Sequence, residues 1–164
     1  MAALIKISDL TFNGRIQLIA FDLIDLLALI LLEGSTLIWS VRGNLDVLGG
    51  KTPVPQPIHE QLNSKMYLDP KGMLLSWKEL LAYANSTVQI SDGVFVGCKN
   101  VDLLPLNVSP YKHPFINPGN DLYRASEIVF EAYESSFWTV YARDNAVIER
   151  FSSAFQSVEI IKTW

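Results

Sequence analysis

The chain of 164 residues is poor in the side chains that build disulfides and metal sites, with one cysteine and two histidines. Cys98 has no second cysteine to pair with, so packing rather than an internal disulfide must stabilise the fold. The spacing of cysteines and histidines that marks a structural zinc site is absent, and His59 and His113 lie in two different expected loops. We therefore expect no metal and no other cofactor.

The motifs that identify common enzymes are also absent. The sequence has no Gly-x-Ser-x-Gly, no phosphate-binding glycine loop and no His-Glu-x-x-His. Cys98 ends an apolar strand pattern, which is typical of a buried, unreactive thiol rather than a nucleophile. We therefore expect no catalytic residue and a protein that is not an enzyme.

The chain has few charged residues, and its 17 acidic residues outnumber its 13 basic residues. Charged residues make up 18% of the chain and the formal net charge is −4, which disfavours direct nucleic-acid binding and favours cationic partners. The N-terminus lacks the basic-then-apolar layout of an export signal, so we expect a cytoplasmic protein. The apolar run Ile16–Leu32 contains Asp22 and Asp25, each costing about 2.5–3.5 kcal/mol at a bilayer centre, so we expect no membrane span.

Hydrophobic residues make up 49% of the chain, enough to build the core of one domain over residues 1–164. The clearest pattern lies near the C-terminus, where two β-prone segments, Ile128–Tyr133 and Phe137–Ala142, flank the polar turn Glu134–Ser136. Alternation in the first segment places Glu131 on a partly polar face. Asp144 can cap a following amphipathic helix. This unit therefore predicts a β-hairpin, a helix and a final strand.

Other elements are predicted by local signals. Ile16–Leu32 fits a strand or a helix, and its length and leucines favour a helix, with Asp22 and Asp25 as a solvated edge. Ser76 and Glu79 form a capping box at a helix start, and Asp92-Gly93 is a favoured pair for a tight hairpin turn. Leu4–Ile7 can form a further short strand. We expect an α+β fold with a mostly antiparallel sheet of five to six strands covered by about three helices. The expected strands are Thr36–Val41, Val88–Ser91, Val94–Cys98, the hairpin Glu127–Ala142 and Val158–Lys162, and the expected helices are Ile16–Leu32, Trp77–Asn85 and Asp144–Phe155.

Acidic and aromatic side chains alternate around the predicted hairpin tip. Glu131 and Glu134 lie beside Tyr133, Phe137 and Trp138, a mixture that suits a basic, partly apolar protein partner better than acid-base catalysis. The alternative is that the aromatic side chains are core and the glutamates are merely solvated.

The run from Ile128 to Asp144 resembles the C-terminal signature of small bacterial immunity or immunity-like proteins. These occur beside polymorphic toxins, including those of contact-dependent growth inhibition. Segments around Trp39, Leu45, Trp77 and Gly93 resemble the same family pattern in the same order. The resemblance implies a non-enzymatic protein that binds a cognate toxin domain, in many cases a basic nuclease, and occludes its active site. The expected interface residues are Asp46, Asp92, Glu131, Tyr133 and Glu134.

Two other functional classes remain open from the sequence. The proline-rich connection Pro105–Leu122 could cover a pocket that belongs to a small enzyme or a ligand-binding domain. The apolar segment Ile16–Leu32 could instead pack against a second copy of itself in a structural subunit. The sequence fits a monomer or a homodimer and does not name the toxin.

Overall fold

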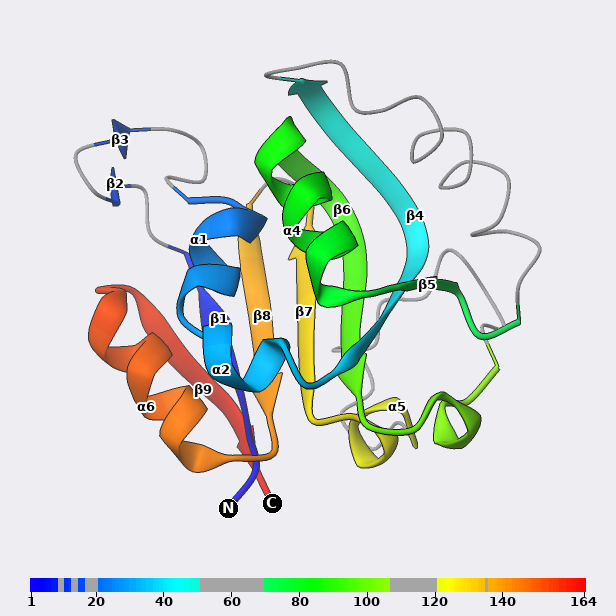
Figure 1. The fold of residues 1–164 in the computed structure, drawn as a ribbon. Helices are drawn as coiled ribbons and strands as arrows, with labels where there is room; N and C mark the ends of the chain where they lie inside the picture. The colour runs from blue at the N-terminus through cyan, green and yellow to red at the C-terminus, as the bar shows by residue number, and fades with distance from the viewer. Residues whose placement is uncertain (9–10, 13–14, 17–20, 51–69, 107–120, 135) are drawn as a thin grey trace.

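The computed structural model describes residues 1–8, 11–12, 15–16, 21–50, 70–106, 121–134 and 136–164. Within them an antiparallel sheet of seven strands has the order β5-β4-β6-β7-β8-β1-β9, and helices pack on it (Figure 1). The sheet strands are β1 (Ala3–Ile7), β4 (Ile38–Gly50), β5 (Met73–Leu75), β6 (Thr87–Cys98), β7 (Ile128–Tyr133), β8 (Phe137–Ala142) and β9 (Val158–Thr163), and β2 (Thr11–Phe12) pairs separately with β3 (Arg15–Ile16). The helices are α1 (Leu23–Ala28), α2 (Leu31–Gly34), α4 (Trp77–Ser86), α5 (Asp121–Ala125) and α6 (Asn145–Ala154), with a 3-10 turn η1 (Val101–Leu103). The predicted α+β class is confirmed.

The C-terminal unit forms as its sequence predicts. β7 and β8 make a regular hairpin in which Tyr133 lies opposite Phe137. Asp144 caps α6 by accepting a hydrogen bond from the amide of Ala146 at 2.9 Å. β1 then lies between β8 and β9, so the N-terminal strand holds the C-terminal strand in the sheet. The two ends of the chain therefore meet at one corner of the fold (Figure 1).

Both faces of the sheet are buried, the first by a large apolar cluster and the second by a smaller one. Helices α1, α4 and α6 cover the first face (Figure 1), where Trp39 and Phe130 stack with ring centroids 5.9 Å apart. On the second face a smaller apolar cluster includes Leu122 and Tyr123 of α5 and Tyr141 of β8. Alternate residues of the central strands therefore belong to two separate cores.

The predicted tight turn at Asp92-Gly93 is wrong. β6 runs without a break through both residues and is paired with β4 on one side and β7 on the other. Gly93 lies opposite Ala132, and the β4–β6 register shifts between Arg42 and Asp46 and again between Asp46 and Val47, without breaking either strand. Ladder pairing along two neighbouring strands outweighs the local turn preference of an Asp-Gly pair.

The predicted single helix Ile16–Leu32 is also wrong, although residues 17–20 of it lie outside the described part. Ile16 ends β3, and two short helices follow at α1 and α2. Asp22 begins α1 as its N-cap, and its amide donates to Asp25 Oδ2 at 2.9 Å. The aspartates are therefore a capping box, with Asp22 only 5% exposed, and not a solvated helix edge.

Several short elements were not predicted, and β5 and α5 are the two that matter for the core. β5 adds an edge strand beside β4, after a turn in which Gly72 has a φ of 78°. α5 begins at the end of the expected connection Pro105–Leu122, of which residues 107–120 lie outside the described part. Of the helices that the structure describes, none is both long and apolar enough to cross a membrane.

Candidate functional site

The structure brings predicted interface residues from β4, β6 and the β7–β8 hairpin together near the tip of that hairpin. Asp46 of β4 is the register partner of Asp92 of β6, and the backbone amide of Glu134 donates to Asp92 Oδ1 at 3.1 Å. Asp92 is half-buried and Glu134 is exposed. We call Asp46, Asp92, Tyr133 and Glu134 the hairpin-tip site. The backbones of its three acidic residues are distant in sequence and come together because β4, β6 and β7 are consecutive strands of the sheet.

Glu134 is at the apex of the β7–β8 turn in an unusual backbone conformation. Its φ is 44°, the one positive φ among the non-glycine residues that the structure describes. The amide and the hydroxyl of Ser136 both donate to the carbonyl of Tyr133 at 2.8 Å, which closes the turn. A left-handed conformation costs about 1–2 kcal/mol for a residue with a Cβ. Positive φ is favoured in tight hairpin turns because it matches the twist of the two strands, so the turn itself accounts for this conformation and fixes the backbone of Glu134.

An aromatic platform adjoins the acidic residues. The rings of Tyr133 and Phe137 stack with centroids 5.0 Å apart and 23° between their planes. Lys6 Nζ lies 4.5 Å from the centroid of the Phe137 ring, so this platform already holds one cation. Both rings are partly exposed, whereas Trp138, which we expected at the same surface, is a core residue with 1% exposure.

Glu131 does not belong to this surface, contrary to our expectation. Its side chain is fully buried on the second face, and Thr139 Oγ1 donates to its Oε2 at 3.5 Å. Burial raises the pKa of the nearby Tyr123 hydroxyl, and the negative charge of Glu131 raises it further. The alternation that places Glu131 on the second face was predicted correctly. The error was to assume that this face is open to solvent.

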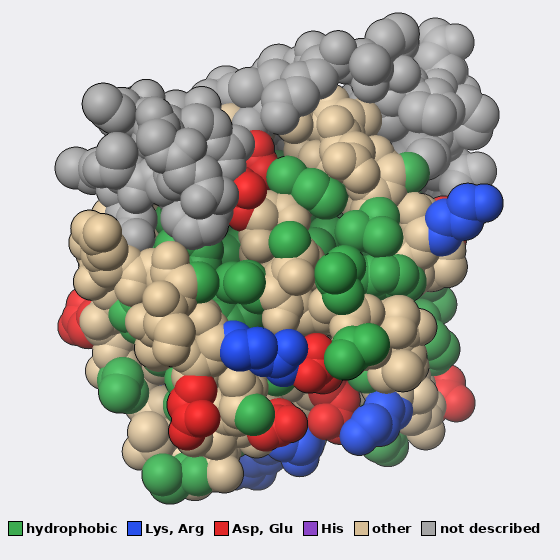
Figure 2. Space-filling view, turned by 60° about the vertical axis from the view of Figure 1, so that its left-hand side comes forward, with side chains coloured by type: hydrophobic (Ala, Val, Ile, Leu, Met, Phe, Trp, Pro, Cys, Tyr) green, Lys and Arg blue, Asp and Glu red, His purple; other side chains and the backbone are tan. Residues whose placement is uncertain are grey.

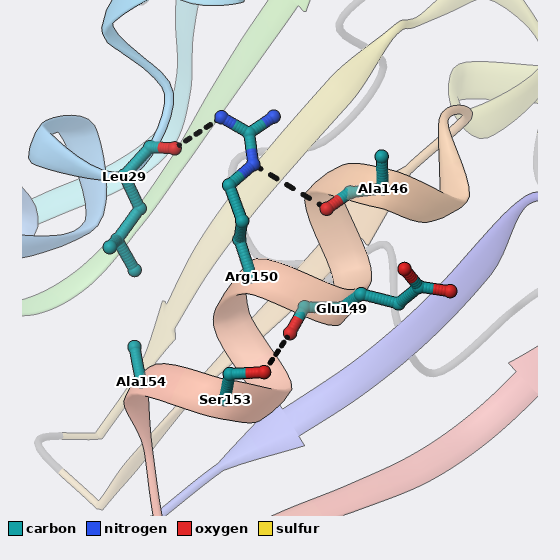
Figure 3. A pocket seen from close by; sticks show the side chains of 6 residues that line it. All are labelled: Leu29, Ala146, Glu149, Arg150, Ser153 and Ala154. Carbon is teal, nitrogen blue, oxygen red and sulfur yellow. Dashed lines mark hydrogen bonds between the residues drawn. The ribbon is translucent and has the colours of Figure 1, made fainter.

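A shallow pocket lies elsewhere, between α6 and the segment joining α1 to α2 (Figure 3). Its volume is about 390 Å³ and its lining is Leu29, Ala146, Glu149, Arg150, Ser153 and Ala154. Arg150 Nη1 donates to the carbonyl of Leu29 at 3.0 Å and to Glu33 Oε2 at 3.2 Å, and Arg150 Nη2 donates to Glu33 Oε1. The hydrogen bonds from Arg150 to the Glu33 carboxylate hold the pKa of Glu33 below its ordinary value. The Ser153 hydroxyl donates to the backbone carbonyl of Glu149 at 2.8 Å, so its proton is not directed at a side chain that could act as a general base.

This pocket is not the one that we expected beneath the Pro105–Leu122 connection, because residues 107–120 lie outside the described part. Periodicity could have indicated its α6 wall, since Ala146, Arg150 and Ala154 recur at four-residue spacing. Its other wall depends on the break between α1 and α2, which the sequence pattern did not reveal.

Groups that could support other chemistry do not converge in the described residues. No cluster of three or more histidine, cysteine or acidic side chains there could hold a metal ion. Cys98 is buried as predicted, and burial raises the pKa of its thiol. A raised pKa lowers the thiolate fraction on which cysteine reactivity depends.

No family model, curated protein or solved structure matches the chain.

Proposed function

We propose that this protein is a non-enzymatic immunity protein that binds a cognate, basic bacterial toxin domain and occludes its active site. The observation that carries the proposal is the hairpin-tip site, where the Glu134 amide is hydrogen-bonded to Asp92 of β6 beside an aromatic platform, and Asp46 is the register partner of Asp92 on β4. Acidic groups around aromatic anchors suit a basic protein surface, because charge steers the encounter and aromatic burial slows dissociation.

The anchored apex supports a binding role. Glu134 has a left-handed backbone in the hairpin turn, and its amide donates to Asp92 of the neighbouring strand β6. A carboxylate held by the backbone also loses less conformational entropy on binding than one on a free loop.

Charge reversal at the site tests the proposal. Asp92→Lys and Glu134→Lys should each weaken binding of the toxin domain encoded beside this gene by about tenfold or more, since each removes attraction and adds repulsion. Titration calorimetry with an active-site-inactivated toxin gives the affinity, and co-expression with the active toxin gives protection of growth.

The matched control is Asp121→Lys, because Asp121 is an exposed acid on α5, near the opposite end of β7 from the hairpin tip. It carries the same change in net charge and should retain nearly full affinity. Equal losses of affinity in all three variants would show that only the net charge, and not the hairpin-tip site, affects binding. A toxin domain that binds neither the wild-type protein nor any variant would end the proposal.

A further inference from the structure

Lys6 connects the N-terminal strand to the hairpin-tip site. It lies in β1, where it is the register partner of Thr139 on β8 and of Glu159 on β9. The other four residues of β1 are buried, so the backbone that carries Lys6 is held in the sheet from both sides. Leu4 belongs to the second apolar cluster, and alternation directs Lys6 to the same face of the sheet. This is the face that carries the aromatic platform.

The contact between Lys6 and the platform runs through one ring. Lys6 Nζ lies 4.5 Å from the centroid of the Phe137 ring, within the roughly 6 Å over which an aromatic face attracts a cation. Phe137 is the register partner of Tyr133, and the two rings stack with centroids 5.0 Å apart. Tyr133 is followed directly by Glu134 at the apex of the turn. A line of contacts therefore leads from a core strand to the exposed end of the hairpin.

The Lys6 ammonium lies over this ring although carboxylates are close to it along the sheet. Glu159 is its register partner on β9, but within the described part of the chain the two side chains form no ion pair. Glu131 lies on the other side of Thr139 and accepts a hydrogen bond from that hydroxyl. The ammonium therefore covers one side of the Phe137 ring and limits the positions that the ring can take.

The two rings need such support because they lie at the end of the β7–β8 ladder. Tyr133 and Phe137 are the last register pair before the turn, and both are partly exposed. Side chains in such a position lose rotamer freedom when a partner binds, and ordering them beforehand lowers that cost. Lys6 supplies this order from a strand that does not belong to the hairpin.

The charge of Lys6 has the opposite effect on a basic partner. An ammonium beside acidic residues lowers the attraction that steers a cationic toxin domain toward them. If charge were its only influence, removal of Lys6 would accelerate association and leave dissociation unchanged. A role in holding the rings predicts faster dissociation as well, so rate measurements separate the two.

We propose that Lys6 is a positioning residue of the hairpin-tip site. It holds the Phe137 and Tyr133 rings in place for an apolar anchor of the toxin domain, while cationic groups of that domain bind the acidic residues of the site. The anchor on the rings is apolar because a second cation there would be repelled by Lys6. This role of Lys6 rests on the proposed function.

The rates of toxin binding, measured by stopped-flow fluorescence, test the role of Lys6. Lys6→Met should raise the association rate constant about twofold, since it removes a repulsive charge. It should raise the dissociation rate about two- to fivefold, which corresponds to the loss of one exposed cation–π contact. Lys6→Arg keeps a cation over the ring and should restore the wild-type dissociation rate. Thermal unfolding verifies that each variant remains folded.

The matched control is Lys162→Met, because Lys162 is also a lysine over an aromatic ring. Its Nζ lies 4.9 Å from the centroid of the Trp164 ring, and its register partner is Leu4, away from the hairpin tip. Figure 2 shows that the described acidic and basic side chains are interspersed on one side of the molecule, and such a side produces little field of one sign at long range. Lys162→Met removes the same charge and should leave the dissociation rate unchanged.

A measurement on the free protein separates this role from the proposed function. In NMR spectra the ε-methylene protons of Lys6 should be shifted upfield by the Phe137 ring. Lys6→Met, but not Lys162→Met, should shift the ring resonances of both Phe137 and Tyr133.

Unchanged Tyr133 resonances in Lys6→Met overturn the role of Lys6. A dissociation rate that Lys6→Met leaves unchanged, or that Lys6→Arg fails to restore, overturns it as well, even where toxin binding is intact. A toxin domain that the wild-type protein does not bind overturns the proposed function and, with it, the binding role of Lys6, whatever the spectra show.

Discussion

Two tyrosine hydroxyls are buried without a hydrogen-bond partner in the described structure. Tyr83 is 0% exposed in the first core and Tyr123 is 2% exposed in the second. Burial of an unpaired hydroxyl costs about 1–3 kcal/mol. Burial also raises the pKa of both phenols above their ordinary value of 10.0.

We expect Tyr83→Phe to raise the free energy of unfolding by about 1 kcal/mol at pH 7, measured by urea denaturation. Because the folded pKa is raised, the unfolded chain loses its phenolic protons first. The wild-type stability is then fully present below about pH 10 and falls as the pH rises above it. Tyr83→Phe combined with Tyr123→Phe should flatten this fall. Destabilisation by Tyr83→Phe at pH 7 would mean that the hydroxyl makes a net favourable contact.

At the same scale, the position of a residue on a strand was easier to predict than its exposure. Alternation correctly assigned Glu131 and Tyr133 to the second face. Only the three-dimensional structure shows that this face carries a second apolar cluster, to which α5 contributes Tyr123. The residues of the hairpin-tip site were predicted as interface residues together with Glu131, but the hydrogen bond from Glu134 to Asp92 depends on strand order, which one sequence does not give.

At the scale of elements, α4 begins at a reciprocal cap. The Glu79 amide donates to Ser76 Oγ at 3.3 Å, and the Ser76 amide donates to Glu79 Oε2 at 2.7 Å. We expect Ser76→Ala to lower the free energy of unfolding by about 1 kcal/mol, since it leaves a helix amide without its acceptor. Ser152→Ala, at an exposed position within α6, is the control and should leave stability unchanged or slightly higher. Equal effects of the two substitutions in thermal unfolding would contradict the role of the cap.

Elements with complete local signals were the ones predicted correctly. α4 has its capping box, α6 has Asp144, and the β7–β8 hairpin has two β-prone segments around a short polar turn. β6 was divided in two because its Asp-Gly pair is a strong local turn signal, whereas the pairing that overrides the signal comes from β4 and β7. β5 has only three residues and exists through its pairing with β4. Elements that depend on distant partners were thus the ones missed.

At the scale of the whole molecule, the sheet order brings distant parts of the chain together at the hairpin-tip site. β4, β6 and the β7–β8 turn contribute its residues, whereas α1, α4 and α6 pack on the first face. β1 pairs with both β8 and β9 and carries Lys6 to the aromatic platform. The N-terminal strand therefore places a cation beside the acidic residues of the site.

The net charge of −4 gives a prediction for kinetics. If the partner is basic, long-range attraction accelerates association, and salt screens this attraction with a Debye length of about 8 Å at 0.15 M. We expect the association rate constant, measured by stopped-flow fluorescence, to fall about tenfold or more between roughly 0.01 and 0.15 M salt. The dissociation rate should change little, because short-range contacts control it.

The neutralising variants Asp92→Asn and Glu134→Gln should lower the association rate and reduce its salt dependence, since each removes one charge from the contact region. Asp121→Asn changes the net charge by the same amount on exposed α5, away from the hairpin tip, and should have a smaller effect. If Asp121→Asn reduced the salt dependence as much as Asp92→Asn, steering would come from net charge alone, and the hairpin-tip site would lose its kinetic role. An association rate independent of salt would instead require a partner surface that is not basic.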